Sequence, residues 1–528
     1  MTSTQETAFF PNPPKAENSG VDFLALGAVG ERLIAFGLPG ITNVTRFLRP
    51  YSVASWITWE YNKGLIALSG HKLTINERAL FRRYREKVEL IFSWANSDVV
   101  RSIGSRRSYP EHLNPVEMRF DNEVFGPPNQ ASWFAAAAYG PSFASSGGLG
   151  FISPHKGAYI TTELGQQMAQ ALDTVLSQHV SAYKRISSLT NTELSRRDLN
   201  SLYDGLSLDS ATDQEKRLFR AALYQEHLVG RIDGLHGNRA TSLALMIRGL
   251  ETAGPMEVNA VRQTMALGLS PKGKKIRLDD LEYMQKLWFV LSIRQLQRVA
   301  LERLLRWFEI TLAENMMKSC DLKFVQDAAA SSLLSENTEA NKTLVGTLMD
   351  KLKSELEACG GPLHAMLQVS HLNAFHLRDE LENTTLNTHH KLIPSRSVSC
   401  LLYCAAITAS ISSGDYADFL RIGGRERISL PWFLEFITQR RQQTLTMFIK
   451  EVISILIYAQ HLQVAATRVE EGKNKFRFAF EDTGLQLLIS PNSVNAQLGT
   501  PDRIVSALLL MSDCNLISMD ANGSFWAA

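Results

Sequence analysis

The stretch from Asp279 to Lys318 constrains the fold more than any other part of the sequence. Asp279 and Glu282 form a capping-box pattern, which is typical of a helix start. Apolar residues then occur nearly all round the predicted helix, namely Leu287, Trp288, Leu291, Leu296, Leu304, Leu305 and Phe308. A helix that is apolar on every side must be covered by other elements. We therefore expect a central helix within a mainly α-helical fold.

The length of the chain predicts several domains, because its 528 residues exceed what one hydrophobic core generally holds. Hydrophobic residues make up 45% and charged residues 20%, which is typical of a globular protein and excludes bulk disorder. Shifts in composition predict a disordered tail at 1–20 and a helical N-terminal domain at 21–185. A helical middle domain at 186–395 and an α+β domain at 396–528 complete the predicted division.

Cysteine usage and hydropathy predict a cytoplasmic protein without a membrane partner. The five cysteines are sparse and odd in number, which fits reduced thiols. The N-terminus has no basic region followed by an apolar run. The most apolar stretches, 400–411 and 448–459, are shorter than the ~18 residues that a membrane span needs. We expect both stretches to be buried helices.

The sequence predicts winged-helix-like units at two positions, near 149–161 and near 475–527. In the first, residues 149–153 and 158–161 predict two strands, and Thr162 caps a helix that continues to about Tyr183. In the second, Thr500 and Pro501 begin a helix, and Asn522-Gly523 joins a hairpin over 516–526. Such units serve either DNA contact or protein docking.

The segment before the second unit also carries strong patterns. Pro431 begins a long predicted helix that reaches about Glu471. Phenylalanines at 476, 478 and 480 then alternate with Arg477, Ala479 and Glu481, which predicts a half-buried strand with its aromatic side chains facing the core.

A basic segment provides the candidate nucleic-acid contacts. Residues 72–107 hold nine Lys or Arg and four Asp or Glu, although the whole chain carries a net charge of only +2. A phosphate-binding site would therefore be a local patch. The candidates are Arg78, Arg82 and Arg85, which share a helix face, together with Arg106, Arg107 and Lys156. A solvated surface explains the same pattern.

One pair of residues predicts an enzymatic alternative. Arg231 and His236 have the Arg-x₄-His spacing that resembles the motif of HEPN-type ribonucleases. Ile232 stands where that family usually has a polar residue, and Gly230 and Gly234 favour a loop over the helix that the motif needs. A HEPN-like ribonuclease that uses Arg231 and His236 remains an alternative.

Other motifs in the sequence are incomplete. Residues 268–274 read Gly-x₄-Gly-Lys, but Lys275 follows where a phosphate-binding loop has Ser or Thr for Mg²⁺. Cys400 and Cys404 lie one helical turn apart in an apolar run, which favours buried thiols over a metal site. We therefore expect no cofactor, no metal ion and no catalytic residue.

Three local stretches resemble uncharacterised bacterial proteins from phage-defence islands. They are the run from Leu38 to Arg46 followed by Tyr51 and Trp56, the helix that begins at Asp279, and the start from Thr500 to Arg503. The resemblance implies a cytoplasmic accessory subunit of a multi-gene antiviral system, such as Druantia, and brings no known active site. We expect a non-enzymatic component of such a complex, which docks onto its other subunits and contacts DNA. A winged-helix transcriptional regulator is a further alternative.

Overall fold

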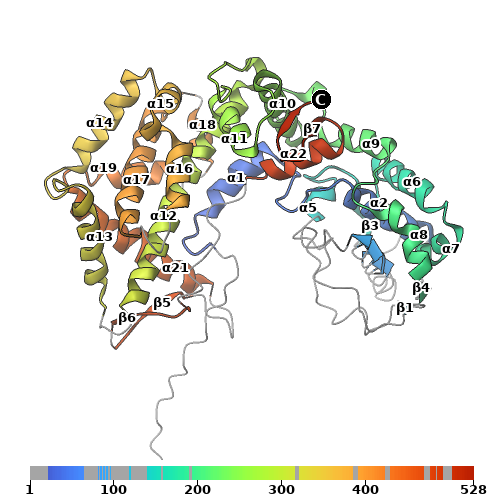
Figure 1. The fold of residues 1–528 in the computed structure, drawn as a ribbon, viewed down its shortest axis with the longest axis horizontal. Helices are drawn as coiled ribbons and strands as arrows, with labels where there is room; N and C mark the ends of the chain where they lie inside the picture. Colours follow the sequence, from blue (N-terminus) through green and yellow to red (C-terminus); the bar gives the residue numbers. More distant parts are fainter. Residues whose placement is uncertain are drawn as a thin grey trace, which may run out of the picture. The chain divides into compact units, whose positions relative to one another are not determined.

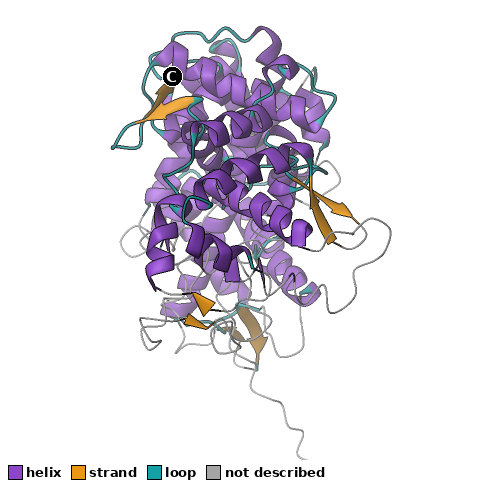
Figure 2. Cartoon of the chain, turned by 90° about the vertical axis from the view of Figure 1, so that its right-hand side faces the viewer, coloured by secondary structure: helices purple, strands orange, loops and turns teal. Residues whose placement is uncertain are grey.

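The computed structural model describes residues 22–64, 140–155, 158–188, 196–315, 320–384, 390–414, 416–422, 428–468, 476–482, 484–490 and 502–528, with 118–119, 193–194 and several positions within 81–96. Helices dominate these residues (Figure 1), and the strands form short antiparallel pairs (Figure 2). The prediction of a mainly α fold with small hairpins is confirmed.

The chain forms two compact units, each from two separate stretches of sequence. Unit 1 comprises residues 1–33 and 286–500, and unit 2 comprises residues 34–285 and 501–528. The division into four consecutive parts stays a prediction, and neither unit coincides with one of those parts.

Unit 1 is built round α12 (Glu282–Glu314), and the start of α1 (Gly27–Gly37) belongs to it. Its other elements are α13 (Leu322–Glu336), α14 (Val345–Ala358), α15 (Pro362–Gln368), η4 (Ser370–Leu372), α16 (Ala374–Asn383), η5 (His390–Leu392), α17 (Ile393–Ser410), α18 (Tyr416–Arg421), α19 (Leu430–Thr438), α20 (Leu445–Glu451), the π-helix η6 (Val452–Ala459), α21 (Gln460–Thr467), β5 (Phe478–Glu481) and β6 (Gly484–Leu487).

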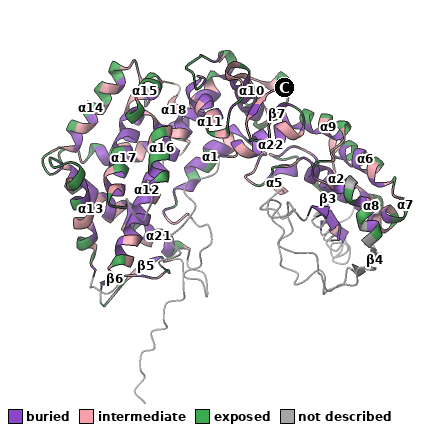
Figure 3. Cartoon of the chain, viewed as in Figure 1, coloured by how far each residue is buried: buried purple, intermediate pink, exposed green. Residues whose placement is uncertain are grey.

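The expectation of a buried central helix is confirmed in unit 1. All seven apolar side chains predicted to surround the helix axis are buried in α12, with Leu287, Leu296, Leu304 and Phe308 fully inaccessible. Figure 3 shows buried residues along α12. The start of the helix differs from the prediction, because a 3₁₀ turn, η3 (Asp279–Leu281), precedes it and Asp279 has a positive φ of 40°. The regular helix therefore begins at Glu282.

Unit 1 also buries charge against α12. Arg306 and Arg477 both pair with Glu309, and all three side chains are at most 4% exposed. The backbone N–H of Arg477 donates to Nε2 of His461 at 3.0 Å, so this imidazole is neutral with its proton on Nδ1, 3.3 Å from the Phe23 carbonyl oxygen. Burial lowers the pKa of His461 to about 4. The cluster fixes the strand β5 to α12 and α21.

This cluster overturns the predicted alternation of the strand at 476–481. The alternation predicts that Arg477 faces solvent, but this side chain is 2% exposed because Glu309 neutralises its charge. Phe478 is buried as predicted, but Phe480 is 67% exposed. A buried ion pair therefore outweighs the aromatic period in setting which residues face the core.

The long helix predicted from Pro431 to about Glu471 is wrong, because the chain breaks between α19 and α20. The carbonyl oxygens of Arg441 and Gln443 accept from the backbone N–H groups of Gly346 and Val345 at 2.9 Å. These are the free donors at the start of α14, which need acceptors outside their own helix. Thr444 then caps α20 by accepting from the N–H of Met447.

One helical run in the described residues, Leu445–Thr467, is long and apolar enough to cross a membrane by length and composition. Half of its most apolar window is buried within the protein. It includes the stretch 448–459, which the sequence predicts to be a shorter buried helix.

Unit 2 holds the remaining elements. They are α2 (Arg49–Gly64), β1 (Met118–Arg119), α5 (Gly140–Phe143), β2 (Ile152–His155), β3 (Ala158–Thr161), α6 (Glu163–Leu176), α7 (Val180–Ser187), β4 (Glu193–Leu194), α8 (Arg196–Leu206), α9 (Asp213–Leu223), η2 (Glu226–Leu228), α10 (Leu235–Ala253), α11 (Val258–Leu267), η3, α22 (Ile504–Asp513), β7 (Ile517–Met519) and β8 (Phe525–Ala527).

A buried arginine organises the interior of unit 2. Arg239 is 1% exposed, and its guanidinium donates to the carbonyl oxygens of Pro39, Gly148, Ala222 and Leu223 at 3.0–3.3 Å. Two of these carbonyls close the end of α9, where a helix offers unpaired acceptors and the negative end of its dipole. Arg239 thus joins α9 to two loops that are distant in sequence.

The predicted hairpin at 149–161 is present as β2 and β3, with Ile152 opposite Thr161. Thr162 caps α6 as predicted, accepting from the N–H of Gly165 at 3.1 Å. A Cβ at Gly165 would lie 1.9 Å from the Phe151 carbonyl oxygen, so only glycine lets the helix approach the hairpin this closely. The predicted helix to Tyr183 is two helices, because α6 ends at Leu176 and α7 begins at Val180.

Candidate functional site

Five segments of unit 2 assemble into a winged-helix-like module. Met256 lies between α10 and α11, and its backbone exchanges two hydrogen bonds of 2.9 Å with Phe525 of β8. Because β8 also pairs with β7, the strand order is Met256, β8, β7. The helices α10, α11 and α22 contact one another or this sheet. The order of helix, strand, two helices and hairpin is that of a winged helix.

The third helix of this module, α22, supplies apolar packing where a DNA-reading module would place its recognition helix. Its sequence contains no Lys or Arg, and Ile504, Ala507, Leu508, Leu510 and Met511 are buried. Recognition helices contact bases and phosphates through polar and cationic side chains. The composition of α22 therefore favours protein packing over DNA contact.

The start of α22 differs from the prediction, which placed it at Thr500 and Pro501, outside the described residues. The helix begins at Ile504, whose backbone N–H donates to Asp502 Oδ1 at 3.2 Å. Asp502 is held in turn by a two-bond pair with Arg262 of α11.

The hairpin β7–β8 is present as predicted, but Asn522-Gly523 is not a two-residue turn. The N–H of Asp520 donates to the Ser524 carbonyl oxygen, so residues 521–523 form the loop. The carboxylate of Asp520 accepts from the N–H groups of Asn522 and Ser524 at 2.9 Å. This local side-chain bond stabilises the longer turn.

Of the six candidate nucleic-acid residues, only Arg85 lies among the described residues. Arg78, Arg82, Arg106, Arg107 and Lys156 lie outside them. The Arg85 guanidinium is 29% exposed and lies 3.2 Å from the carboxylate of Glu89, which is 4% exposed. Arg85 thus already has an anionic neighbour, which reduces the charge it presents to a phosphate.

The structure disfavours a catalytic role for Arg231 and His236. Arg231 is exposed and precedes α10, whereas His236 lies in its first turn, so the pair does not share a helix. His236 Nδ1 lies 2.9 Å from Arg239 Nη2, and because a guanidinium can only donate, Nδ1 accepts. Burial and the Arg239 charge lower the pKa of His236, so the neutral ring carries its proton on Nε2. A general base would need that nitrogen unprotonated.

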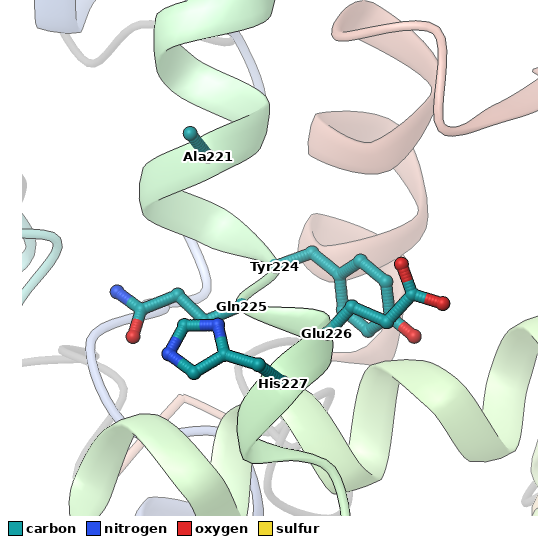
Figure 4. A pocket seen from close by; sticks show the side chains of 5 residues that line it. All are labelled: Ala221, Tyr224, Gln225, Glu226 and His227. Atoms are coloured by element: carbon teal, nitrogen blue, oxygen red, sulfur yellow. The ribbon is translucent and has the colours of Figure 1, made fainter.

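A shallow surface pocket of about 560 Å³ lies between the end of α9 and η2. Ala221, Tyr224, Gln225, Glu226 and His227 line it, and Figure 4 shows Tyr224 beside Glu226 while Gln225 and His227 project to the other side. Burial raises the pKa of Tyr224, as does the neighbouring Glu226. Because Glu226 and His227 point apart, the pocket does not pair an acid with a base.

The sulfur and histidine candidates are structural or dispersed. Cys400 and Cys404 are buried in α17, where desolvation raises the pKa of Cys400 to about 12, as expected of inert thiols. His371 and His376 each lie near one glutamate, at 3.5 and 3.3 Å. In the described part of the chain, no three His, Cys, Asp or Glu side chains group as a metal site would require.

Unit 1 contains a cavity of about 540 Å³ between α17, α18 and α19, which we call the unit 1 groove. Its lining residues are Thr408, Ser412, Ala417, Leu420, Arg421, Pro431, Leu434, Glu435 and Thr438. Leu420 is buried, and Pro431 and Leu434 are half-buried, so apolar side chains form the floor.

Polar side chains border this floor. Arg421, Glu435, Thr438 and Ser412 are exposed, and Arg421 forms an ion pair with Asp418 at 3.0 Å. An apolar floor with a few polar groups at its edge is the usual make-up of a binding cavity, and this volume is within the usual range. The opposite charges of Arg421 and Glu435 would orient whatever enters.

Neither the unit 1 groove nor the continuity of the winged-helix-like module could be predicted from the sequence. The sequence predicts helical residues after Pro431 and over 400–411, but the groove exists only where three helices meet. The module could not be predicted because residues 268–503 separate α11 from α22 in the sequence. The backbone pairing of Met256 with Phe525 and the ion pair of Arg262 with Asp502 show that the two ends belong together.

No family model, no curated protein and no solved structure matches this chain, so its residues and their geometry carry the functional argument alone.

Proposed function

We propose that the chain is a non-enzymatic component of a bacterial antiviral defence system, which acts in the cytoplasm by docking onto partner proteins. The observation that carries the docking role is the unit 1 groove, with its apolar floor at Leu420, Pro431 and Leu434 and its charged edge at Arg421 and Glu435. The antiviral setting comes from the resemblance of the three stretches to phage-defence proteins.

We propose one kind of occupant for the groove, an apolar side chain presented by a helix of a partner protein. A cavity of about 540 Å³ has room for large apolar side chains, because pockets of this volume hold drug-sized molecules. Buried anchors of this kind supply most of the binding energy in protein interfaces, while a surrounding polar rim excludes water. Arg421 and Glu435 would then pair with opposite charges on the partner helix.

The residues of α22 and His236 also favour a role in protein contact. The apolar α22 contributes packing to the winged-helix-like module, and His236 is engaged by Arg239. The contacts expected of Arg78, Arg82, Arg85, Arg106, Arg107 and Lys156 with DNA stay predictions.

A plaque assay with the native gene cluster tests the proposal. Leu434→Glu places a charge on the groove floor and is expected to lower protection at least tenfold. Leu367→Glu is the matched control, because Leu367 is 37% exposed on α15 outside the groove, and it should leave protection unchanged.

His236→Ala provides the opposing arm of the same assay. The docking role predicts that this variant protects as well as the wild type. Loss of protection in His236→Ala with full protection in Leu434→Glu would favour the ribonuclease alternative and contradict the proposal.

A further inference from the structure

A short basic hairpin follows α11 in unit 2. Residues 270–273 read Ser-Pro-Lys-Gly, which places the residues that a type I turn favours at its first, second and fourth positions. The structure has this turn: the N–H of Gly273 donates to the Ser270 carbonyl oxygen at 2.8 Å, and Gly273 has a φ of 78°. Glycine adopts this left-handed conformation without strain.

The base of the hairpin is fixed to the rest of unit 2. Ser270 and Ile276 are 3% and 5% exposed, and Leu269 pairs with Lys275 across the hairpin. The N–H of Ile276 donates to the Gly268 carbonyl oxygen, and the hydroxyl of Ser270 accepts from the N–H of Lys274, both at 3.0 Å. The backbone at the tip is therefore held in place before any ligand arrives.

Three lysines project from this fixed backbone. Lys272, Lys274 and Lys275 are all exposed, and within the stretches that the structure describes none of them forms an ion pair. The nearest acids in sequence have other partners, since Asp279 pairs with Arg248 and Arg277. Asp280 also lies 3.7 Å from Arg248. The hairpin thus concentrates uncompensated positive charge in a chain whose net charge is only +2.

We propose that Lys272, Lys274 and Lys275 form a nucleic-acid contact site that binds the phosphate backbone of a duplex without reading its sequence. Lysine is a mobile point charge suited to phosphates, whereas it is depleted at the centres of protein interfaces. The tip exposes no aromatic or large apolar side chain that could anchor a protein partner. This site stands on the hairpin alone and does not depend on the unit 1 groove.

The experiment measures binding of the full chain to a labelled 20-base-pair duplex of arbitrary sequence by fluorescence anisotropy, between ~50 and ~200 mM salt. The test variant is K272Q/K274Q/K275Q. The matched control is K342Q/K351Q/K353Q, which removes the same charge from exposed positions in and before α14, where Glu339 and Glu355 already pair with two of the lysines.

The test variant is expected to bind the duplex at least tenfold more weakly than the wild type at ~100 mM salt. The slope of log K against log salt should shrink by about three, because each lost phosphate contact removes roughly 0.9. The control triple should keep both the affinity and the slope. All substitutions are at exposed positions, so circular dichroism and thermal melting should match the wild type.

Three results would overturn the proposal: no duplex binding by the wild-type chain, equal losses in both triple variants, or an unchanged salt slope in the test variant. Parallel titrations use polyglutamate and vesicles with ~20% phosphatidylserine. A loss of binding to either that equals the loss for the duplex would assign the hairpin to acidic proteins or to lipids instead.

Discussion

Two buried arginine sites, one in each unit, show two different ways to stabilise positive charge in a protein interior. In unit 1, Arg306 and Arg477 surround the carboxylate of Glu309, so the charge is cancelled by an anion. In unit 2, Arg239 is equally buried but has only backbone carbonyl oxygens and one imidazole nitrogen around it. Burial lowers the pKa of Arg239 to about 10, although it stays charged at neutral pH.

Each site depends on a different property of the groups that form it. The unit 1 cluster depends on one acid, because without it two buried cations would face each other. The Arg239 site depends on the shape of the guanidinium, whose five donors reach several carbonyls at once. In both, a polar side chain ties together segments that are far apart in sequence, which apolar patterning alone does not predict.

The largest expected effect comes from Glu309→Gln. It leaves Arg306 and Arg477 buried without an anion and should lower the free energy of unfolding of unit 1 by about 3–5 kcal/mol. Hydrogen exchange should accelerate in α12 and β5 and stay unchanged in α10. Glu357→Gln, the same change at an exposed position of α14, is the control and should be silent. A stability loss below ~1 kcal/mol would show that the cluster does not depend on its acid.

Arg239→Met should cost somewhat less, about 2–4 kcal/mol, because it strands four carbonyl oxygens that water can partly satisfy. The expected signature is faster hydrogen exchange at the end of α9 and in α10. Arg239→Lys keeps the charge but reaches fewer carbonyls, so it should lose most of the same stability. Full stability in the lysine variant would contradict the argument from shape.

Acid should weaken unit 1 through His461. Its folded pKa of about 4 lies below the ordinary value of 6.5, so the unfolded chain binds the proton more tightly. The stability of unit 1 should therefore fall as the pH drops from about 6.5 to about 4, by up to about 3 kcal/mol at ~1.4 kcal/mol per pKa unit. Denaturant titrations across this range should show the loss in the wild type and a flatter profile in His461→Gln.

Unit 2 should show a smaller effect of the opposite sign through Asp513. Burial raises the pKa of this carboxyl to about 6, assisted by Asp209 and opposed by the hydrogen bond from the N–H of Leu48. The folded state then holds the proton more tightly, so stability falls as the pH rises from about 4 to about 6. Asp513→Asn should remove this dependence and stabilise unit 2 at pH 7 by up to about 3 kcal/mol, at ~1.4 kcal/mol per pKa unit. If stability changes with pH equally in the wild type and in Asp513→Asn, Asp513 is not the source of the dependence.

Local chemistry predicted from the sequence agrees with the structure where one residue and its near neighbours decide the outcome. Thr162 caps its helix, the apolar residues of α12 are buried, and the hairpins lie close to the residues that the strand patterns predicted. Such features depend on interactions over a few residues.

The rest depends on contacts between distant residues. Nothing local predicts that Arg477 finds Glu309, or that the carbonyls of Arg441 and Gln443 are used by α14. In the sequence, most of unit 1 separates the two ends of the winged-helix-like module, and the unit 1 groove arises from three separate helices. The spacing of Arg231 and His236 likewise does not predict their positions in the fold. Arg231 precedes α10, whereas His236 lies within it and contacts Arg239.

The docking role is tested most directly by co-purification from the native gene cluster, with this chain tagged and the proteins encoded beside it expressed together. The docking role predicts that a cluster-encoded partner co-elutes with the wild type and with Leu367→Glu in fixed stoichiometry. The same partner should be lost with Leu434→Glu although unit 1 melts normally. Retention of that partner by Leu434→Glu would contradict the assignment of the unit 1 groove as the docking site.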